Sequence, residues 1–523
     1  MNSRRRQALA ATMVRMSILL SVVIGLLSML GTPLAAAEPK HGGTLTVGLA
    51  ADIAHFDVFH AIGYEAYWVL ENIHSGLVRV DPQGNIIPDM ATSWDVKDDG
   101  RTYVFHLHKG ITFHDGTPAD AAAIKWNIDY ILDPANTADA RLFFRPIAAV
   151  DALDDTTLQI QLQEPAADFL MVLAGYRLAS LVASPTAVQH WGKEYKFHPV
   201  GAGPFKFVAW TPGQQVVLEK NAHYFKPGLP YLDRIVLKTM KDATTRLGAV
   251  RAGELDFATW VPLEMVRVLE RVPGVHVVSG PMYNVWDLLL NAARPPFDDL
   301  RVRQAVAGYG LDRQELVTLG FFGYGQPSVS MLTPGMPGYH SLLERYPYDP
   351  KQAKALLQEA GYGPGHPLTF TLLAPTIEPA FTNVPTLFKA QLERLGVQMQ
   401  LAMLDKVTWM DRVARQHDFQ ATMGNLTGVA IGAFAPFFET ASPLNIAQHS
   451  DTRVDALFQQ WRTTAEATVH AQATEQLQAY LADTLYLTGL ANTPFYHGVR
   501  ESVQGYTFVD KLHLHFEAAW LER

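Results

Sequence analysis

Two hydrophobic periods alternate along this chain, one of about two residues and one of about 3.6 residues. The clearest two-residue period runs from 102 to 108, where Tyr103, Phe105 and Leu107 alternate with a second set of side chains. An Asp-Asp-Gly turn signal at 98–100 precedes it. The sequence therefore predicts a half-buried strand that begins after a tight turn.

Capping residues mark the starts of several helices. The Thr-Pro-Ala-Asp segment at 117–120 predicts a capping box with Pro in the first helical position, followed by a helix to about Leu132. Asp312 with Glu315 predicts a second capped start, and the Asp-Pro pair at 349–350 predicts a third. Each cap lets a side chain satisfy free backbone N–H groups, so these positions indicate true helix boundaries.

Further strands are predicted at 215–220, 234–240, 368–373 and 397–401, with a helix from about 385 to 395 between the last two. Strands and capped helices are therefore mixed through the whole chain. This pattern indicates an α/β protein. With 523 residues, the chain is too long for one hydrophobic core and should form at least two domains.

The N-terminus has the pattern of a secretion signal. Four arginines among the first 15 residues precede an apolar run at 16–30, and small residues follow at 35–37. The run is shorter than the roughly 20 residues that span a bilayer, so we expect cleavage after Ala37. The arginines leave both the general and the twin-arginine export routes open.

Composition restricts the chemistry further. The chain has no cysteine, which excludes disulfides, thiolate metal sites and a lipid-modified N-terminal cysteine. Loss of residues 1–37 removes four arginines and no acid, so the formal net charge falls from −9 to −13. Such an acidic protein is poorly suited to nucleic acid. A secreted protein without an anchor is expected in the periplasm of a two-membrane cell.

Catalytic signatures are missing from the sequence. It contains no G-x-S-x-G, H-E-x-x-H or Walker-type phosphate loop. The chain has 19 histidines, and the pairs His106 with His108 and His513 with His515 have strand spacing that places each pair on one face. Strand histidines more often serve packing than metal binding, so we expect neither an enzyme nor a metal or cofactor site.

Long motifs in a fixed order resemble bacterial extracellular solute-binding proteins of family 5. The run from Leu70 to Pro134 is similar to the family's signature region. Similar motifs follow along most of the chain: GGTLTVGL from Gly42, VGAGPFKF from Val200, LLLNAARPPFDDLRVRQAV from Leu288, YDPKQAKALLQEAGYGPG from Tyr348 and DTRVDALF from Asp451.

The resemblance implies a two-lobed periplasmic binding protein of the type II-like, cluster C architecture, with mixed sheets and an extra subdomain on the first lobe. The chain would cross between lobes near Gly280 and return near Thr488, which makes a hinge of two crossings. The implied domains are a signal peptide (1–37), a discontinuous first lobe (38–75, 199–280 and 488–523), an extra subdomain (76–198) and a second lobe (281–487).

The resemblance also implies where a ligand lies. In peptide-binding relatives, a second-lobe strand presents an aspartate to the free ammonium group of the peptide. Counting along this strand from Asp418, the expected tryptophan position holds Gly424 and the expected aspartate position holds Thr427. The usual amine anchor is therefore replaced, which disfavours ordinary dipeptide or oligopeptide recognition.

Other residues match cleft positions of the family. Arg177 lies where an arginine can meet a ligand carboxylate, and its fork-shaped guanidinium suits that role. Aromatic and polar side chains at the remaining positions either contact ligand or pack the fold. The full set of candidate ligand-binding residues is Tyr64, Tyr67, Arg141, Phe144, Arg177, Asn284, Trp286, Gly424, Asn425 and Thr427.

The function implied by the resemblance is reversible binding of a small organic solute, peptide or peptide-like and able to carry a carboxylate, for an ABC importer. The loaded, monomeric protein would dock on the membrane permease and its ATPase. Three alternatives stay open: a peptide receptor with altered amine recognition, a nickel-chelate binder and a secreted hydrolase.

Overall fold

The structure is a computed structural model that describes residues 38–60, 63–175, 181–280, 282–377, 379–428, 431–464, 467–509 and 513–522. The predicted signal peptide lies outside these residues. Residues 41–523 form one compact unit. Within the described ranges, no helix is long and apolar enough to cross a membrane.

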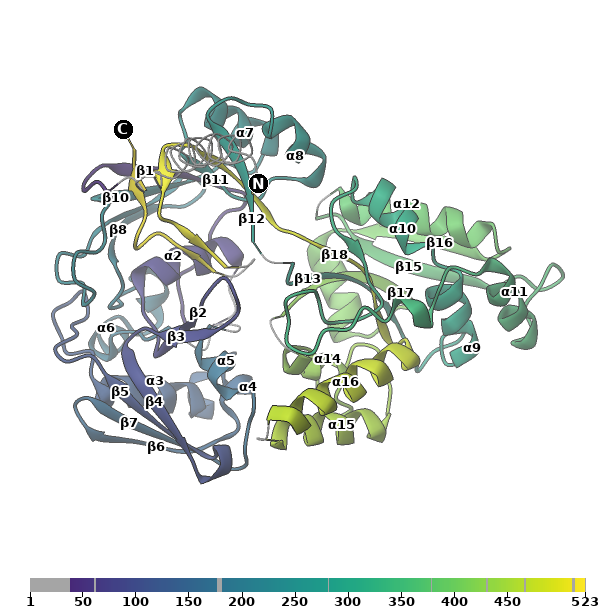
Figure 1. Ribbon diagram of the computed structural model, residues 1–523, viewed down its shortest axis with the longest axis horizontal. Coiled ribbons are helices and arrows are strands. Elements are labelled where there is room, and N and C mark those ends of the chain that lie inside the picture. Colours follow the sequence, from purple (N-terminus) through teal and green to yellow (C-terminus); the bar gives the residue numbers. More distant parts are fainter. Residues whose placement is uncertain are drawn as a thin grey trace, which may run out of the picture. The chain divides into compact units, whose positions relative to one another are not determined.

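A seven-stranded mixed sheet organises the first part of the fold (Figure 1). Its central strand β1 runs parallel to both neighbours, and the other pairs are antiparallel. One strand comes from the C-terminal region, so distant parts of the sequence complete this sheet. In spatial order the strands are β12 (Val275–Ser279), β19 (Tyr496–Arg500), β11 (Phe257–Ala258), β1 (Thr44–Leu49), β10 (Arg234–Thr239), β9 (Gln215–Lys220) and β8 (Phe205–Thr211).

A six-stranded sheet organises the second part. Its strand β13 is buried along its whole length and pairs with β17 on one side and β18 on the other. Figure 1 shows β13, β17 and β18 adjacent to one another. In spatial order the strands are β14 (Gln326–Pro327), β18 (Leu487–Thr493), β13 (Asn284–Leu290), β17 (Ala421–Thr427), β15 (Thr369–Pro375) and β16 (Gln398–Leu404).

The chain passes between these two sheets twice, from β12 to β13 and from β18 to β19. The expected return near Thr488 is too early, because β18 stays paired with β13 through Thr493. The return therefore lies between Thr493 and Tyr496, where Pro494 interrupts strand pairing.

A four-stranded antiparallel sheet lies in the segment between β1 and β8, and helix α3 (Ala121–Leu132) packs against it. The predicted strand at 102–108 is confirmed as β5, although its burial exceeds the prediction because Val104 is also buried. The strands, in spatial order, are β4 (Ala91–Lys97), β5 (Thr102–Leu107), β7 (Thr157–Leu162) and β6 (Ile147–Asp154).

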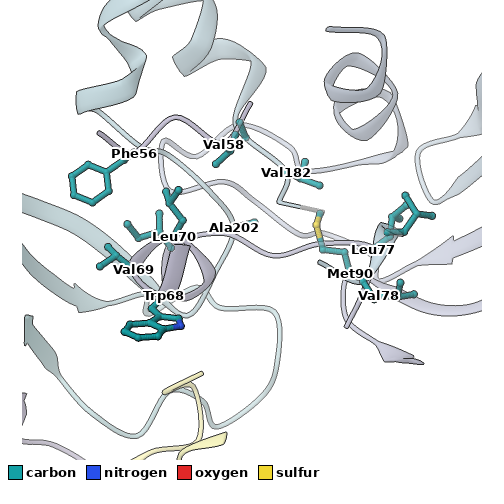
Figure 2. Packing of buried hydrophobic residues seen from close by; sticks show 14 of the residues in the cluster. Phe56, Val58, Trp68, Val69, Leu70, Leu77, Val78, Met90, Val182 and Ala202 are labelled. Carbon is teal, nitrogen blue, oxygen red and sulfur yellow. The ribbon is translucent and has the colours of Figure 1, made fainter. Parts of the chain in front are cut away.

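The cores follow the sheets. One hydrophobic cluster joins the seven-stranded sheet to the four-stranded sheet, and Figure 2 shows Val69 and Leu70 of helix α2 within it, together with Met90 and Val182. The six-stranded sheet has a separate cluster on each face. The extra subdomain thus shares its core with the first sheet, whereas the second sheet has its own.

Helices α11 (Pro350–Glu359) and α12 (Ala380–Glu393) contribute to the cluster on one face of the six-stranded sheet. Helices α14 (Ala435–Phe438), α15 (Thr452–Thr463) and α16 (Ala467–Thr484) contribute to the cluster on the other face. Short strands β2 and β3 form a hairpin. The helices and this hairpin are α2 (Tyr64–Ile73), α4 (Arg141–Phe144), α5 (Phe169–Leu173), α6 (Pro185–Trp191), α7 (Ala243–Ala252), α8 (Leu263–Leu269), α9 (Leu300–Arg303), α10 (Arg313–Glu315), α11 (Pro350–Glu359), α12 (Ala380–Glu393), α13 (Lys406–Met410), α14 (Ala435–Phe438), α15 (Thr452–Thr463), α16 (Ala467–Thr484), β2 (Val78–Val80) and β3 (Ile86–Pro88).

Two predicted caps are confirmed and one is wrong. The Asp312 carboxylate accepts the Glu315 N–H, and Asp349 caps α11 with Pro350 in its first turn. At α3 the cap is Asp120, which accepts the Ala123 N–H, so the helix begins later than the capping box at 117–120 predicts. The hydroxyl of Thr117 instead bonds to Asp115 within the preceding turn.

The helix predicted from about 385 starts earlier, because Pro385 lies inside α12 rather than in its first turn. The predicted strands at 215–220, 234–240, 368–373 and 397–401 correspond to β9, β10, β15 and β16.

Gly203 marks a close approach between two backbones. Its N–H donates to the Ile73 carbonyl at 2.8 Å, and an added Cβ would lie 2.6 Å from the Ile73 carbonyl carbon. The backbone atoms of Ile73 and His74 cannot move away from an added methyl group as a flexible side chain could. The glycine therefore lets the segment before β8 lie directly on the end of α2.

Gly203→Ala should lower the free energy of unfolding by about 2 kcal/mol or more, because the methyl group overpacks fixed backbone. Gly248→Ala on α7 is the matched control, since an added Cβ meets nothing within 4 Å there. It should be neutral or stabilise by up to about 1 kcal/mol through helix propensity. Urea denaturation measures both, and equal stability of the two variants would contradict the close approach.

Candidate functional site

Thr493, the last residue of β18, organises the start of β13. Its hydroxyl oxygen accepts hydrogen bonds from Asn284 Nδ2 and Trp286 Nε1, each at 3.0 Å. All three side chains are buried. Two of the predicted ligand-binding residues are therefore held by one hydroxyl at the crossing between the sheets.

The neighbouring strand β17 supplies two more predicted residues to this place. Asn425 pairs with Trp286, and Thr427 pairs with Asn284 in the antiparallel register. Directly paired residues share a face, and the Thr427 hydroxyl donates to Asn284 Oδ1 at 3.4 Å. The sheet thus brings together Asn284, Trp286, Asn425 and Thr427, as the resemblance implies.

These residues border a small cavity of about 40 Å³, which we call the hinge pocket. Trp260 and Phe495 meet in it edge to face, with ring centroids 4.6 Å apart, and Tyr64 lies 6.1 Å from Trp260. The pocket is mostly apolar, with five aromatic residues among its lining and a few amide, hydroxyl and carboxyl groups. Its lining is Trp260–Glu264, Asn284, Trp286, Phe322, Pro379, Ala380, Asn425 and Thr493–Tyr496.

A larger cavity of about 780 Å³, which we call the outer pocket, lies between two segments far apart in sequence. Its volume falls in the range of roughly 300 to 1,000 Å³ that is typical of small-molecule sites. The lining residues are Phe143, Arg145, Pro146, Gln163, Glu164, Ala166, Asp168, Phe169, Val172, Gly432, Ala435, Pro436, Glu439, Ala441–Pro443, Asp455, Ala456, Gln459 and Arg462.

Polar contacts join the two sides of the outer pocket. The Ala167 N–H donates to the Arg462 carbonyl at 3.1 Å, and Gln459 Nε2 donates to Glu164 Oε2 at 3.0 Å. Arg462 also pairs with Glu439 at 2.6 Å. Burial raises the pKa of Asp168, although the positive charge of Arg462 opposes the shift.

Two further predicted residues, Phe144 and Arg141, lie apart from the hinge pocket. Phe144 is 1% exposed and packs in the core, and its role toward ligand stays a prediction; Phe143 and Arg145 line the outer pocket. Arg141 is exposed on α4 and lines neither pocket. Arg177 lies outside the described residues.

Tyr67 is buried on α2, and its hydroxyl donates to the Gly175 carbonyl at 3.0 Å. Its ring lies 5.9 Å from the ring of His513, edge to face. The packing of Tyr67 is thus defined, and its role toward ligand stays a prediction.

The histidine pairs have different surroundings. His106 pairs with Asp95 at the surface. His513 and His515 lie beside the buried Glu71, and these three could offer metal ligands. Burial alone would raise the pKa of Glu71, but the charges of His513 and His515 and the hydrogen bonds from His513 and the Leu514 N–H lower it.

Asp287 is a buried acid that the sequence analysis did not select. It lies mid-strand in β13, directly opposite Gly424, and is 3% exposed. Burial raises its pKa to about 8, with only the Leu426 backbone N–H acting against the shift. The sequence holds one signal that could have selected Asp287: it is the single acid in the run from Val285 to Leu290. Strands buried on both faces are otherwise nearly continuous apolar runs.

The fold and pockets define a two-lobed binding protein of mixed α/β structure. The family model of bacterial extracellular solute-binding proteins, family 5 (middle region), matches residues 85–446. The chain belongs to this family of solute-binding proteins.

Curated relatives include the glutathione-binding protein GsiB of Pectobacterium atrosepticum, 33% identical over 82% of this chain and 83% of the relative. GsiB of Escherichia coli K12 is 32% identical over 72% of each chain.

Solved structures agree in fold. AgaA of A. tumefaciens R10 in complex with agropinic acid has a TM-score of 0.80 and 25% identity, covering 92% of this chain and 99% of that one. DppA of Helicobacter pylori with the peptide STSA has a TM-score of 0.80 and 24% identity, with the same coverage. This chain is thus an extracellular solute-binding protein of family 5.

Thr493→Val should destabilise the protein by about 2 kcal/mol, because two buried donors, on Asn284 and Trp286, lose their acceptor. Thr493→Ser keeps the oxygen and should restore most of the loss. Chemical denaturation measures both variants. Equal stability of the valine and serine variants would show that the hydroxyl does not hold the crossing.

Asp287 should make stability depend on pH. Its folded pKa of about 8 exceeds the ordinary aspartate pKa of 3.8, so the folded state holds the proton more tightly. The free energy of unfolding should therefore fall as pH rises from about 4 to about 8, by an amount on the order of a few kcal/mol.

Asp287→Asn should remove this dependence, so its stability advantage over the wild type grows from pH 5 to pH 8. Asp298→Asn, an exposed aspartate on the same part of the chain, is the matched control. Urea denaturation of dialysed protein at both pH values tests this. A constant difference between Asp287→Asn and the wild type would contradict the unpaired buried carboxyl.

Proposed function

We propose that this chain captures a peptide-like solute of roughly dipeptide to tripeptide size and releases it to an ABC permease. The observation that carries the proposal is the outer pocket, about 780 Å³ in volume and lined from both 143–172 and 432–462. A solute held there would contact both segments at once. Binding would then favour the arrangement in which they meet.

Glutathione is the first compound to test, because the relatives at 32–33% identity are glutathione-binding proteins. A γ-linked tripeptide carries one ammonium and two carboxylates and fits the volume. The partly buried Arg462 and the backbone at the rim of the pocket are suitable partners for carboxylates. Opines such as agropinic acid, bound by AgaA, are the next class to test.

We further propose that residues 1–37 are removed on export and that the mature protein is a periplasmic monomer without a lipid anchor. The absence of cysteine supports this, since no residue can accept the usual N-terminal lipid. The permease and its ATPase would supply the energy for transport. Reversible binding without turnover would be the protein's whole task.

Thermal shift and calorimetry with glutathione, dipeptides and opines test the proposal. A true ligand at a hundredfold excess over its Kd should add about 2.7 kcal/mol to the free energy of unfolding. The compound should also be recovered unchanged. Turnover of a stabilising compound would contradict a binding role, and failure of the whole panel to bind would contradict the peptide-like class.

Ala456→Trp tests the location of the solute. Ala456 lines the outer pocket on α15, so an indole there should occupy the cavity and weaken binding at least tenfold. Ala471→Trp on α16 is the control, because Ala471 is exposed and lines neither pocket. Unchanged affinity in Ala456→Trp would place the solute elsewhere.

A further inference from the structure

Helix α2 and the C-terminal segment of the chain bring one carboxylate and two imidazoles together. Glu71 lies in the last turn of α2, and His513 and His515 flank Leu514 at strand β22 (Leu514–His515), which pairs with β21 (Thr507–Phe508). One possible ligand atom from each of the three side chains lies within 4.8 Å of the other two. In the described part of the chain, no other group of three His, Asp or Glu side chains meets this condition.

The distances within this cluster suit a small divalent metal ion. Glu71 Oε1 lies 2.5 Å from His513 Nδ1 and 3.9 Å from His515 Nε2. Zinc bonds of about 2.0–2.1 Å at tetrahedral angles hold two ligand atoms about 3.3 Å apart. The two measured separations lie on either side of this value, so movements of less than about 1 Å would complete the coordination.

An ion pair between Glu71 and His513 alone leaves His515 unexplained. His515 Nε2 is too far from Glu71 Oε1 for a hydrogen bond, yet its side chain is only 11% exposed beside the same oxygen. Residues two apart on a strand share a face, and the two imidazole planes are nearly parallel, at 12°. A metal ion uses both imidazoles and the carboxylate, whereas a salt bridge needs only one imidazole.

Hydrogen bonds hold these side chains in place. The Leu514 N–H donates to Glu71 Oε2 at 3.2 Å, which leaves Oε1 beside the histidines. Asn72, the next residue on α2, donates from Nδ2 to the Leu514 carbonyl at 3.0 Å and accepts the Phe516 N–H at 2.9 Å. Such outer contacts orient the metal ligands of proteins. The strand that carries the histidines is therefore fixed against the helix that carries the carboxylate.

A cavity of about 20 Å³ borders Glu71 and His515. This volume holds about one water molecule, which is the usual fourth ligand of a zinc ion with three protein ligands. A non-haem iron centre with the same set of two histidines and one carboxylate needs further open coordination positions, and the cavity is too small for them. The space therefore favours four-coordinate zinc.

The charges around the cavity permit a cation. Arg79 pairs with Asp89 and Glu517, and Lys226 pairs with the same two acids. These two positive charges thus offset two of the three acids near the cavity. Glu71 is the third acid, and a buried carboxylate of this kind is either paired with a cation or coordinates a metal.

We propose that Glu71, His513 and His515 bind one zinc ion, with a water molecule in the adjacent cavity as the fourth ligand. The cavity has no room for a substrate, so the ion would serve the structure by fastening the C-terminal segment to α2. The sequence pattern of the histidine pair did not predict a metal site, because the carboxylate ligand lies 442 residues from His513. This inference is independent of the proposed function, since no solute takes part in it.

Zinc uptake by the wild-type protein, purified without a histidine tag, tests the proposal. The protein is treated with a chelator, freed of the chelator and titrated with zinc chloride, and native mass spectrometry and calorimetry count the bound ions. One ion per chain is expected, and zinc should raise the free energy of unfolding measured in urea. X-ray absorption at the zinc edge should show two imidazole ligands.

Glu71→Gln and His515→Ala each remove one ligand. Each should weaken zinc binding at least about a hundredfold, because loss of an outer contact alone costs roughly 10- to 100-fold. His106→Ala is the matched control, since it removes one histidine of the exposed strand pair and should bind zinc as the wild type does.

A wild type that binds no zinc would overturn the proposal, and so would Glu71→Gln and His515→Ala variants that bind zinc as tightly as the wild type. If neither variant folds, the X-ray absorption spectrum of the wild type decides. Fewer than two imidazole ligands in that spectrum would also overturn the proposal.

Discussion

The pairing of β13 on both of its edges is the constraint on which the ligand-facing part of this structure depends. All seven residues of β13 are buried, and β17 and β18 hydrogen-bond to it along most of its length. A shift of one residue would exchange the side chains of its two buried faces and place Asp287 in the cluster that holds Trp286 and Leu288. The first crossing leads into β13, and the second leaves from β18. The register between β13 and β18 therefore fixes where both crossings meet the six-stranded sheet.

The two faces of β13 divide the chemistry. Trp286 and Leu288 belong to one hydrophobic cluster, and Val285 and Leu289 belong to the other. Asn284 and Trp286 line the hinge pocket, whereas Asp287 lies on the opposite face of the strand. One short strand thus supplies an aromatic side chain that packs at the crossing and, one residue further along, a buried acid.

Sequence patterns predicted the elements well where the signal is local. The caps at Asp312 and Asp349 and the strands at 215–220 and 234–240 depend on neighbouring residues, and all are confirmed. The predicted start near 385 is wrong, because α12 begins at Ala380 and Pro385 lies inside the helix. Proline excludes one hydrogen bond, but packing of the surrounding apolar face can compensate.

The candidate site was predicted only in part, because its decisive relations are not local. Family resemblance located β17, and the structure indeed brings Asn425 and Thr427 beside Trp286 and Asn284. The opposition of Asp287 and Gly424 joins strands that are more than a hundred residues apart, and no sequence period encodes such a register. The family resemblance gives Phe144 a cleft position, but an aromatic beside an arginine has the same sequence pattern in a core as at a surface, and the structure buries it.

The contacts across the outer pocket have a character that suits a receptor which must release its cargo. They include the Gln459 to Glu164 hydrogen bond and the Ala167 to Arg462 backbone bond, and exposed polar contacts of this kind can be exchanged for water at small net cost. A large apolar interface would hold the two segments together whether or not solute was present. With polar contacts the joined and separated arrangements of the two segments differ little in free energy. A solute that binds the joined arrangement more tightly can therefore decide which arrangement prevails. Reversible capture therefore follows from the weakness of these contacts as much as from the strength of any single ligand anchor.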